Sequence, residues 1–277
     1  MEETFIEVRP GEQLFARIWQ PKTQPLAITC LVHGLSDHSG RFTGLAEELS
    51  KHGYIFIAPD LRGNGKSPGV RGDFDSLSQV LDDIKAIIDY SKSRFAGLPV
   101  FLYGQSMGGN LAINFALRHP SSISGVISSS PWLRLTNPPS RIVRIAAAIL
   151  KPLFPKMLIN NGLKSTDLCH DTVVQSAYDN DPLIHWKVSL STFFIINNGG
   201  EWAVENAGLL QLPLLLMHGD ADMITSFEAS REFARKAGQN CTFIEWPGLY
   251  HELHNEPGRD AIYDAVNAWL SSQTKST

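Results

Sequence analysis

The chain has 277 residues, enough for one large domain or two small ones. Hydrophobic residues make up 43% of it and charged residues 19%, proportions typical of folded globular proteins, which excludes a mainly disordered or fibrous chain. The formal net charge is −4 and the basic residues are scattered, so no nucleic-acid partner is expected.

Cysteine usage and the N-terminus indicate the compartment. Cys30, Cys169 and Cys241 are an odd number at wide spacing, which disfavours a disulfide framework or a metal-binding Cys-x-x-Cys pair. The chain begins Met-Glu-Glu-Thr, with acidic residues where an export signal carries positive charge. The longest apolar runs, 145–150 and 212–217, fall far short of the roughly 20 residues that cross a bilayer. We therefore expect a cytoplasmic protein.

Strand-like and helix-like segments alternate in the first half of the chain. Residues 4–8 and 13–19 predict an antiparallel hairpin that turns at Pro10-Gly11. The further segments are buried strands at 26–33, 54–58, 99–103 and 123–129, with helical spacing between them from Phe42 to Leu49, over 77–95 and over 107–119. This order is typical of the α/β class, a mainly parallel sheet covered by helices on both faces.

The alternation stops between residues 132 and 208. That stretch contains helix-like pieces separated by Pro138-Pro139, Pro152, Pro155, 160–162, Pro182 and 197–200. Strands at 212–218 and 241–246 and helices at 226–237 and 259–270 then restore the alternation. We therefore expect a core formed by residues 1–131 and 209–277, and an inserted helical cap formed by residues 132–208.

Ser106 lies in the segment Gly104-Gln-Ser-Met-Gly108, a Gly-x-Ser-x-Gly motif between a predicted strand and a predicted helix. In that context the motif predicts a nucleophile elbow, because so sharp a turn has no room for side chains at the flanking positions. A serine hydroxyl is a weak nucleophile at neutral pH. It needs a basic group beside it, and that base needs an acid to orient it.

Acids and histidines follow the two late strands, in the order nucleophile, acid, base that is typical of α/β hydrolases. Asp220 and Asp222 come after strand 212–218, and their spacing leaves both open as the acid. His251 and His254 come after strand 241–246. His251 is favoured as the base because it lies nearer the strand, and His254 is then an ordinary residue at the start of the last helix.

The segment His33-Gly34-Leu35 ends the first buried strand, at the sheet edge where Ser106 is expected. A developing oxyanion needs preorganised donors, and the backbone amides of Leu35 and Met107 are placed to supply them. The glycine-rich loop 60–67 lacks the spacing of a phosphate-binding loop, so we interpret it as structural.

The chain resembles the monoacylglycerol lipases of the α/β-hydrolase superfamily, in the branch that also contains lysophospholipases and related carboxylesterases. The matching segments span nearly the whole chain and are 33–41, 60–67, 104–109, 178–182, 218–222 and 247–252. The resemblance implies an α/β-hydrolase fold, with a mostly parallel central sheet flanked by helices and an inserted helical cap. It further implies the nucleophile Ser106, the acid Asp222, the base His251, and an oxyanion hole at Leu35 and Met107.

In that branch, polar residues near the oxyanion loop and on the cap receive the hydroxyls of glycerol. The matching positions are Asp37, Arg41 and Tyr178, together with Gln105 beside the serine. Gln105 stands where close relatives usually have histidine, and Asp37 where they usually have glutamate. The Gln105 amide both donates and accepts hydrogen bonds, so recognition of glycerol is still implied.

The cap segment 142–158 is apolar on more than one helical face, with the basic residues Arg141, Arg144, Lys151 and Lys156 interspersed. A helix that is apolar on two faces needs two apolar partners. One is the protein body, and the other is predicted to be an acyl chain or a lipid surface, touched transiently at the periphery of a membrane. The alternative is a cap helix packed wholly on its neighbours.

The sequence therefore predicts a serine hydrolase that needs no cofactor and no metal. It is expected to cleave single-chain acyl esters, monoacylglycerol above all, to a fatty acid and glycerol through an acyl-enzyme intermediate. A lysophospholipase or a broad-specificity carboxylesterase is the alternative, because the triad is the same. A non-catalytic binding protein of the same fold is a remote alternative, since all three triad positions are filled.

Overall fold

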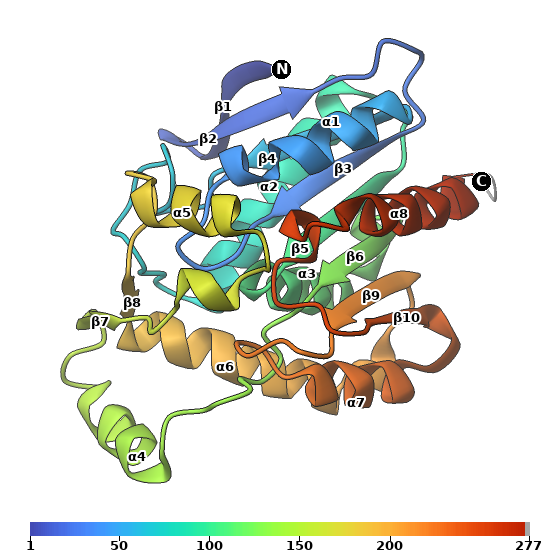
Figure 1. Ribbon diagram of the computed structural model, residues 1–277. Helices are drawn as coiled ribbons and strands as arrows, with labels where there is room; N and C mark the ends of the chain where they lie inside the picture. The colour runs from blue at the N-terminus through green and yellow to red at the C-terminus, as the bar shows by residue number, and fades with distance from the viewer. Residues whose placement is uncertain (275–277) are drawn as a thin grey trace.

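The computed structural model describes residues 1–274, in which one eight-stranded sheet lies between two layers of helices (Figure 1). The strand order is β1-β2-β4-β3-β5-β6-β9-β10. The bounds of these strands are β1 Glu2–Arg9, β2 Glu12–Trp19, β3 Ala27–Val32, β4 Tyr54–Pro59, β5 Val100–Gln105, β6 Gly125–Ser129, β9 Leu214–Gly219 and β10 Cys241–Trp246. Neighbours from β4 to β10 are parallel, and β2 is antiparallel to β1 and to β4, which confirms the predicted hairpin and the mainly parallel sheet.

The central strands are buried throughout because helices cover both of their faces. Every residue of β3, β4, β5, β6 and β9 is buried. The edge strand β1 instead alternates between exposed positions and partly or fully buried ones over most of its length. The carboxyl ends of the parallel strands meet along one edge of the sheet, and the loops that follow β3, β5, β9 and β10 lie there.

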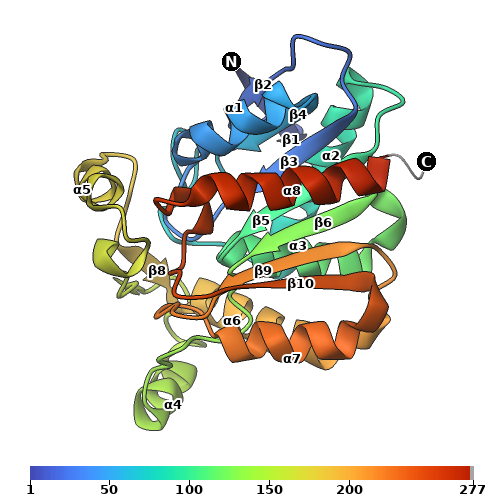
Figure 2. The same cartoon turned by 45° about the vertical axis from the view of Figure 1, so that its right-hand side comes forward.

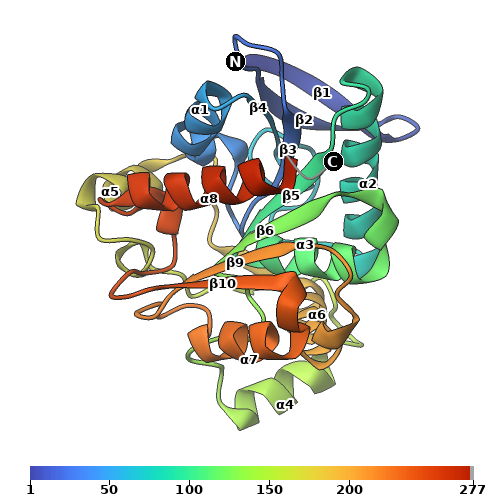
Figure 3. The same ribbon diagram turned by 90° about the vertical axis from the view of Figure 1, so that its right-hand side faces the viewer.

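Two apolar clusters lie on opposite faces of the sheet. On one face the layer consists of α1 (Thr43–Lys51) and α8 (Arg259–Thr274). On the other face it consists of α2 (Leu77–Arg94), α3 (Met107–Arg118), α6 (Leu190–Glu205) and α7 (Phe227–Ala237). Figures 2 and 3 show α8 crossing the first face while α6 and α7 lie on the second.

The segment 132–208, which the sequence predicts as a cap, has two parts in the structure. Its first part contains α4 (Arg141–Leu150), β7 (Leu158–Asn160), α5 (Thr172–Asn180) and β8 (Lys187–Ser189), and β7 pairs with β8 as an antiparallel ribbon that the sequence did not predict. Its last part, α6, packs against α3 and α7 beside the sheet.

Gly199 and Gly200 explain why the sequence does not predict α6 as a single helix. The segment 197–200 is expected to separate two helical pieces, whereas both glycines lie inside one continuous helix. A Cβ at Gly200 would collide with the backbone of Leu133, and Gly199 faces the Asn110 side chain. The glycines therefore allow α6 to approach its neighbours closely, which offsets their poor helix propensity.

Helix α4 projects from the body at the lower left of Figure 1. None of its residues is buried, so the alternative of a cap helix packed wholly on its neighbours is wrong. Its apolar side chains are therefore exposed to solvent. Within residues 1–274, no helix combines the length and the apolarity needed to cross a bilayer.

Candidate active site

Ser106 forms the sharp turn between β5 and α3, with φ of 56° and ψ of −119°. A positive φ is rare for a residue with a side chain and is maintained only where the surroundings enforce it. A Cβ at Gly104 would collide with the backbone of Gly108, and a Cβ at Gly108 would collide with the carbonyl oxygen of Val32. Both glycines of the motif are therefore sterically required.

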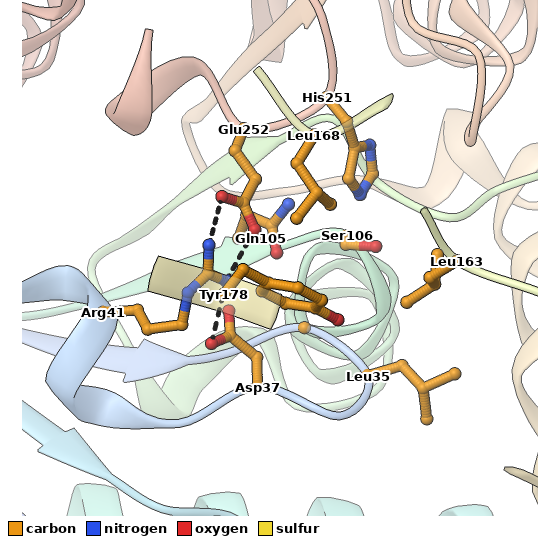
Figure 4. Close-up of a pocket in the computed structure, with 11 residues that line it drawn as sticks. Leu35, Asp37, Arg41, Gln105, Ser106, Leu163, Leu168, Tyr178, His251 and Glu252 are labelled. Atoms are coloured by element: carbon orange, nitrogen blue, oxygen red, sulfur yellow. Dashed lines mark hydrogen bonds and ion pairs between the residues drawn. The ribbon is translucent and has the colours of Figure 1, made fainter. Parts of the chain in front are cut away.

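Backbone hydrogen bonds fix the serine in this conformation. The Ser106 amide donates to the carbonyl of Ser129 across 3.0 Å, and its carbonyl accepts from the amides of Asn110 (3.1 Å) and Trp132 (2.9 Å). The Ser106 side chain opens into a small pocket that also contains His251 (Figure 4). One ring nitrogen of His251 points toward the serine in that view.

Asp222 and His251 form a buried hydrogen-bonded pair. Nδ1 of His251 donates to Oδ2 of Asp222 across 2.7 Å. The other oxygen, Oδ1, accepts from the backbone amides of Ile224 (2.7 Å) and Thr225 (3.0 Å). The loop after β9 therefore fixes the carboxylate, and the carboxylate orients the ring so that Nε2 is left free among residues 1–274 to face the pocket.

The two charges stabilise each other. Burial opposes ionisation of Asp222, yet the charge of His251 and hydrogen bonds from His218 and His251 hold the pKa of this carboxyl well below its usual range. Burial likewise opposes the charged form of His251, and the Asp222 carboxylate outweighs it, so the pKa of His251 is raised. An imidazolium formed during a reaction would therefore be stabilised.

The competing acid and histidine lie elsewhere. Asp220 is exposed, and its Oδ1 accepts from the Gly248 amide across 2.6 Å. His254 is 1% exposed and stacks on Phe42, with ring centroids 4.4 Å apart, rather than starting the last helix at the surface. The geometry thus brings Asp222, and not Asp220, to the ring of His251.

A polar pocket lies on one side of Ser106. It contains all four positions implied for head-group binding, Asp37, Arg41, Gln105 and Tyr178. The Tyr178 ring covers the guanidinium of Arg41, with Cζ 4.6 Å from the ring centroid. The Tyr178 hydroxyl is buried and has no hydrogen-bond partner among residues 1–274.

A largely apolar cavity of about 450 Å³ also borders the serine, and its lining includes the polar residues Asn137, Lys164 and Asp167. Its apolar wall includes the side chains of Trp132, Leu135, Ile159, Val188, Phe193 and Ile224. Leu35, Ser106 and Leu163 border both spaces. A molecule bound across Ser106 would therefore meet hydrogen-bonding groups at one end and hydrocarbon at the other.

The two amides expected to bind an oxyanion flank this junction. The Leu35 amide follows β3 and has no acceptor among residues 1–274, and the Met107 amide opens α3, where the first N–H groups of a helix lack intrahelical partners. The loop 60–67 is bonded to the loop after β3, because Oδ1 of Asp60 accepts from the Ser39 amide across 2.7 Å and the Leu61 amide donates to Nε2 of His33 across 2.8 Å. This fits the structural role expected for that loop.

The loop after β3 is also tied to the cap. Ser36, with φ of 61°, receives a hydrogen bond from Nδ2 of Asn161 (2.9 Å), and its hydroxyl lies 3.2 Å from Nδ1 of His185. Nε2 of His38 donates to Oδ2 of Asp181 across 2.8 Å. These bonds therefore join the loop that bears the Leu35 amide to residues between 161 and 185.

Comparison with known proteins identifies the family. Residues 23–258 match the family model described as serine aminopeptidase, S33. The chain belongs to this S33 family of α/β hydrolases. The expected α/β-hydrolase fold is thereby confirmed, and the S33 protein is a carboxylic ester hydrolase of the monoacylglycerol-lipase-like group.

Several relatives resemble this S33 hydrolase over most of their length. A monoacylglycerol lipase of Mycolicibacterium smegmatis is 30% identical over 95% of the chain and 94% of its own length. Phospholipase YtpA of Bacillus subtilis is 34% identical over 89% of the chain and 95% of its own length. The crystal structure of a Paleococcus ferrophilus monoacylglycerol lipase superposes with a TM-score of 0.86, at 32% identity over 94% of the chain and 99% of that protein.

Two residues of the S33 site were missed by the sequence analysis. His218, to which the sequence analysis assigns no role, donates from Nε2 to Oδ2 of Asp222 across 3.0 Å. His218 lies at the end of a strand, four residues before Asp222, and this spacing is the sequence signal that could have indicated the contact. Glu252 pairs with Arg41, and only its position next to His251 pointed to the pocket.

Among residues 1–274, no three His, Cys, Asp or Glu side chains are grouped to hold a metal ion.

Proposed function

We propose that this S33 hydrolase cleaves single-chain acyl esters, monoacylglycerol above all, to a fatty acid and glycerol. The observation that carries the proposal is the position of Ser106 between a polar pocket and an apolar cavity. The cavity suits an acyl chain. The pocket has hydrogen-bonding groups for hydroxyls, and its volume of about 20 Å³ must widen to take a glycerol head group. The names of the relatives from M. smegmatis and P. ferrophilus support the same substrate class.

In the proposed mechanism, His251 takes the proton of Ser106 while the serine oxygen attacks the ester carbonyl. The amides of Leu35 and Met107 donate to the resulting oxyanion. His251 then gives the proton to the leaving alcohol oxygen, and the acyl-enzyme forms. Water, activated by His251, attacks this intermediate and releases the fatty acid. Asp222 orients the ring and stabilises its charged form.

The head group is proposed to bind opposite the acyl chain. The Tyr178 hydroxyl and the Gln105 amide lack side-chain partners among residues 1–274 and are available to glycerol hydroxyls. Asp37 accepts the His38 amide at Oδ1, across 2.7 Å, which leaves Oδ2 as a further acceptor. A buried hydroxyl without a partner costs free energy, so a substrate hydroxyl is a favourable partner for Tyr178.

Contact with lipid surfaces is proposed to occur through α4. Ile142, Ile145 and Ile149 recur at helical spacing and are 81%, 52% and 67% exposed. Arg141 and Arg144 lie on the same helix. An exposed apolar face with basic neighbours is typical of helices that lie at a membrane interface. We infer that the protein works in the cytoplasm and takes its substrate from such surfaces.

The B. subtilis relative is named a phospholipase, which favours phospholipids as a second substrate class, and a lysophospholipid is the member of that class with a single acyl chain. The same acyl-enzyme mechanism would apply, so only the head group decides between the two. A panel of monoacylglycerol, lysophosphatidylcholine and nitrophenyl esters, all with one acyl chain, separates a monoacylglycerol lipase from a lysophospholipase and from a general carboxylesterase. We expect the highest kcat/KM for monoacylglycerol.

The proposal as a whole is tested at Ser106. Ser106→Ala is expected to lower nitrophenyl ester hydrolysis by at least about 10³-fold, because the nucleophile is lost, while the circular dichroism spectrum stays unchanged. A fluorophosphonate probe should label the wild-type serine and leave the variant unlabelled. Retention of most of the activity in Ser106→Ala would contradict the assigned nucleophile.

A further inference from the structure

Arg41 lies between two carboxylates in the polar pocket (Figure 4). Its Nη1 and Nη2 donate to the two oxygens of Glu252 across 2.7 and 2.6 Å. Nη1 also lies 3.2 Å from Oδ1 of Asp37. The Arg41, Asp37 and Glu252 side chains are 9%, 4% and 3% exposed, so water screens these charges little. The hydrogen-bonding fork of the arginine is therefore occupied by the protein itself.

The pocket carries a net negative charge. Burial disfavours ionisation of Glu252, but the charge of Arg41 and its hydrogen bonds lower the pKa of this carboxyl to about 2. Burial works against the charged guanidinium, and the charges of Glu252 and Asp37 outweigh it, so the pKa of Arg41 is raised. Two carboxylates thus face one guanidinium. Burial and the charge of Asp37 raise the pKa of Tyr178, which keeps its hydroxyl neutral.

The groups left for a ligand are therefore neutral or negative. The Tyr178 hydroxyl is buried without a partner among residues 1–274, and the Gln105 amide lines the same pocket. Both groups can form hydrogen bonds with the hydroxyls of an alcohol. A phosphate would lie close to two carboxylates, and it would gain Arg41 only by displacing a bidentate, buried ion pair.

We propose that Glu252 is a specificity-determining residue, which makes the pocket accept neutral, hydroxylated head groups and reject phosphorylated ones. This inference rests on the proposed function. Glu252 acts in two ways, because it holds Arg41 away from an incoming anion and adds a repelling charge of its own. Rejection of the unwanted partner by an unfavourable charge is a common basis of specificity.

The test compares two substrates with the same acyl chain, monodecanoylglycerol and its 3-phosphate, and measures kcat/KM for each with the full-length protein. The wild type is expected to prefer the neutral ester. Glu252→Gln keeps the size of the side chain and removes one negative charge. The phosphate-to-neutral ratio of kcat/KM should then rise about tenfold or more, the order expected for one unit charge in a partly desolvated site.

Glu256→Gln is the matched control, because Glu256 is also buried but pairs with His170 and does not line the pocket. It should leave the ratio unchanged. If Glu252→Gln does not fold, Asp37→Asn removes the second carboxylate and should raise the same ratio. A ratio of kcat/KM is insensitive to a general loss of activity, which a merely structural role would produce.

The possible failures are distinguishable. A wild type that hydrolyses both decanoyl esters with similar kcat/KM overturns the inference and leaves the proposed function intact. An unchanged ratio in a folded Glu252→Gln protein overturns it as well. If the wild type cleaves neither ester but a fluorophosphonate still labels Ser106, the proposed substrate class is wrong.

Discussion

His218 donates a hydrogen bond to the same oxygen of Asp222 that accepts the bond from His251, over distances of 3.0 and 2.7 Å. The carbonyl of Thr225 lies 3.1 Å from the same nitrogen of His218. Both neighbours of this nitrogen accept hydrogen bonds, so Nε2 must carry the proton. The other ring nitrogen, Nδ1, lies 2.7 Å from the Ser230 hydroxyl, and this second hydrogen bond fixes the orientation of the ring. His218 is thus a fixed donor to the carboxylate.

Replacing His218 should affect the pair that it contacts. The hydrogen bond of His218 lowers the pKa of Asp222, so His218→Phe makes this carboxylate more basic and makes it bind the His251 proton more tightly. At a pH on the acid limb we expect kcat/KM for a nitrophenyl ester to fall by up to about tenfold, because a larger share of His251 is protonated and cannot act as the base. The acid limb of the pH profile should move to higher pH.

His218→Gln tests whether the donor itself matters, since the amide of glutamine can donate from a similar position. It should restore part of the activity and return the acid limb toward that of the wild type. Equal pH profiles for the wild type and His218→Phe would mean that His218 only fills space.

The wild-type pH profile follows from the raised pKa of His251. The ring acts as a base only when it is neutral. As pH falls, protonation therefore removes activity, and it does so at a pH above the ordinary histidine pKa of about 6.5. Initial rates of nitrophenyl ester hydrolysis should give an acid limb of kcat/KM with an apparent pKa above this value. An apparent pKa clearly below 6.5 would be inconsistent with the Asp222–His251 pair.

The elbow should not tolerate a larger residue at position 108. A Cβ at Gly108 would overlap the Val32 carbonyl, which belongs to a buried strand. Gly108→Ala should lower the free energy of unfolding by about 2–3 kcal/mol, as overpacking does, and should disturb the start of α3. Urea unfolding followed by circular dichroism measures this change.

Gly208→Ala is the control for that experiment. A Cβ at Gly208 would meet nothing closer than the Lys236 carbonyl at 3.7 Å, an ordinary contact. The control should stay within about 0.5 kcal/mol of the wild type. If both glycine variants unfold at the same urea concentration, the steric argument for the elbow does not hold.

The exposed face of α4 should decide binding to lipid surfaces. In the double variant Ile142→Asp and Ile149→Asp, two apolar side chains become charged on one face, and partitioning onto phosphatidylcholine vesicles with added phosphatidylglycerol should weaken about tenfold or more. Co-sedimentation measures it. Val173→Asp is the control, because Val173 is 76% exposed on α5 and lies outside α4. Equal weakening by the control would mean that general charge, and not α4, governs binding.

The sheet and the elbow were predictable because their signals are local. Apolar runs mark β3 to β6, and the motif around Ser106 sits where a strand passes into a helix. A Cβ at Gly104 or Gly108 would collide with nearby backbone, so only glycine fits at these two positions of the turn. The pairing of Asp222 with His251 is less local, and sequence spacing alone left Asp220 and His254 open.

Other parts of the site depend on contacts between distant segments. Glu252 and Arg41 are far apart in sequence, and no sequence motif around either residue indicates that they form a pair. The continuity of α6 depends on its packing against α3, which outweighs the helix-breaking tendency of Gly199 and Gly200. The β7–β8 ribbon is too short for its alternation to be recognised in the sequence.

Asn161 donates to Ser36, and His38 donates to Asp181. These two hydrogen bonds join the predicted cap segment to the loop that bears the Leu35 amide. If the segment moves away to admit a substrate, both bonds break and the loop is held less firmly. The Leu35 amide would then return to its position in this structure only when these bonds form again, which would link substrate entry to the readiness of the oxyanion site.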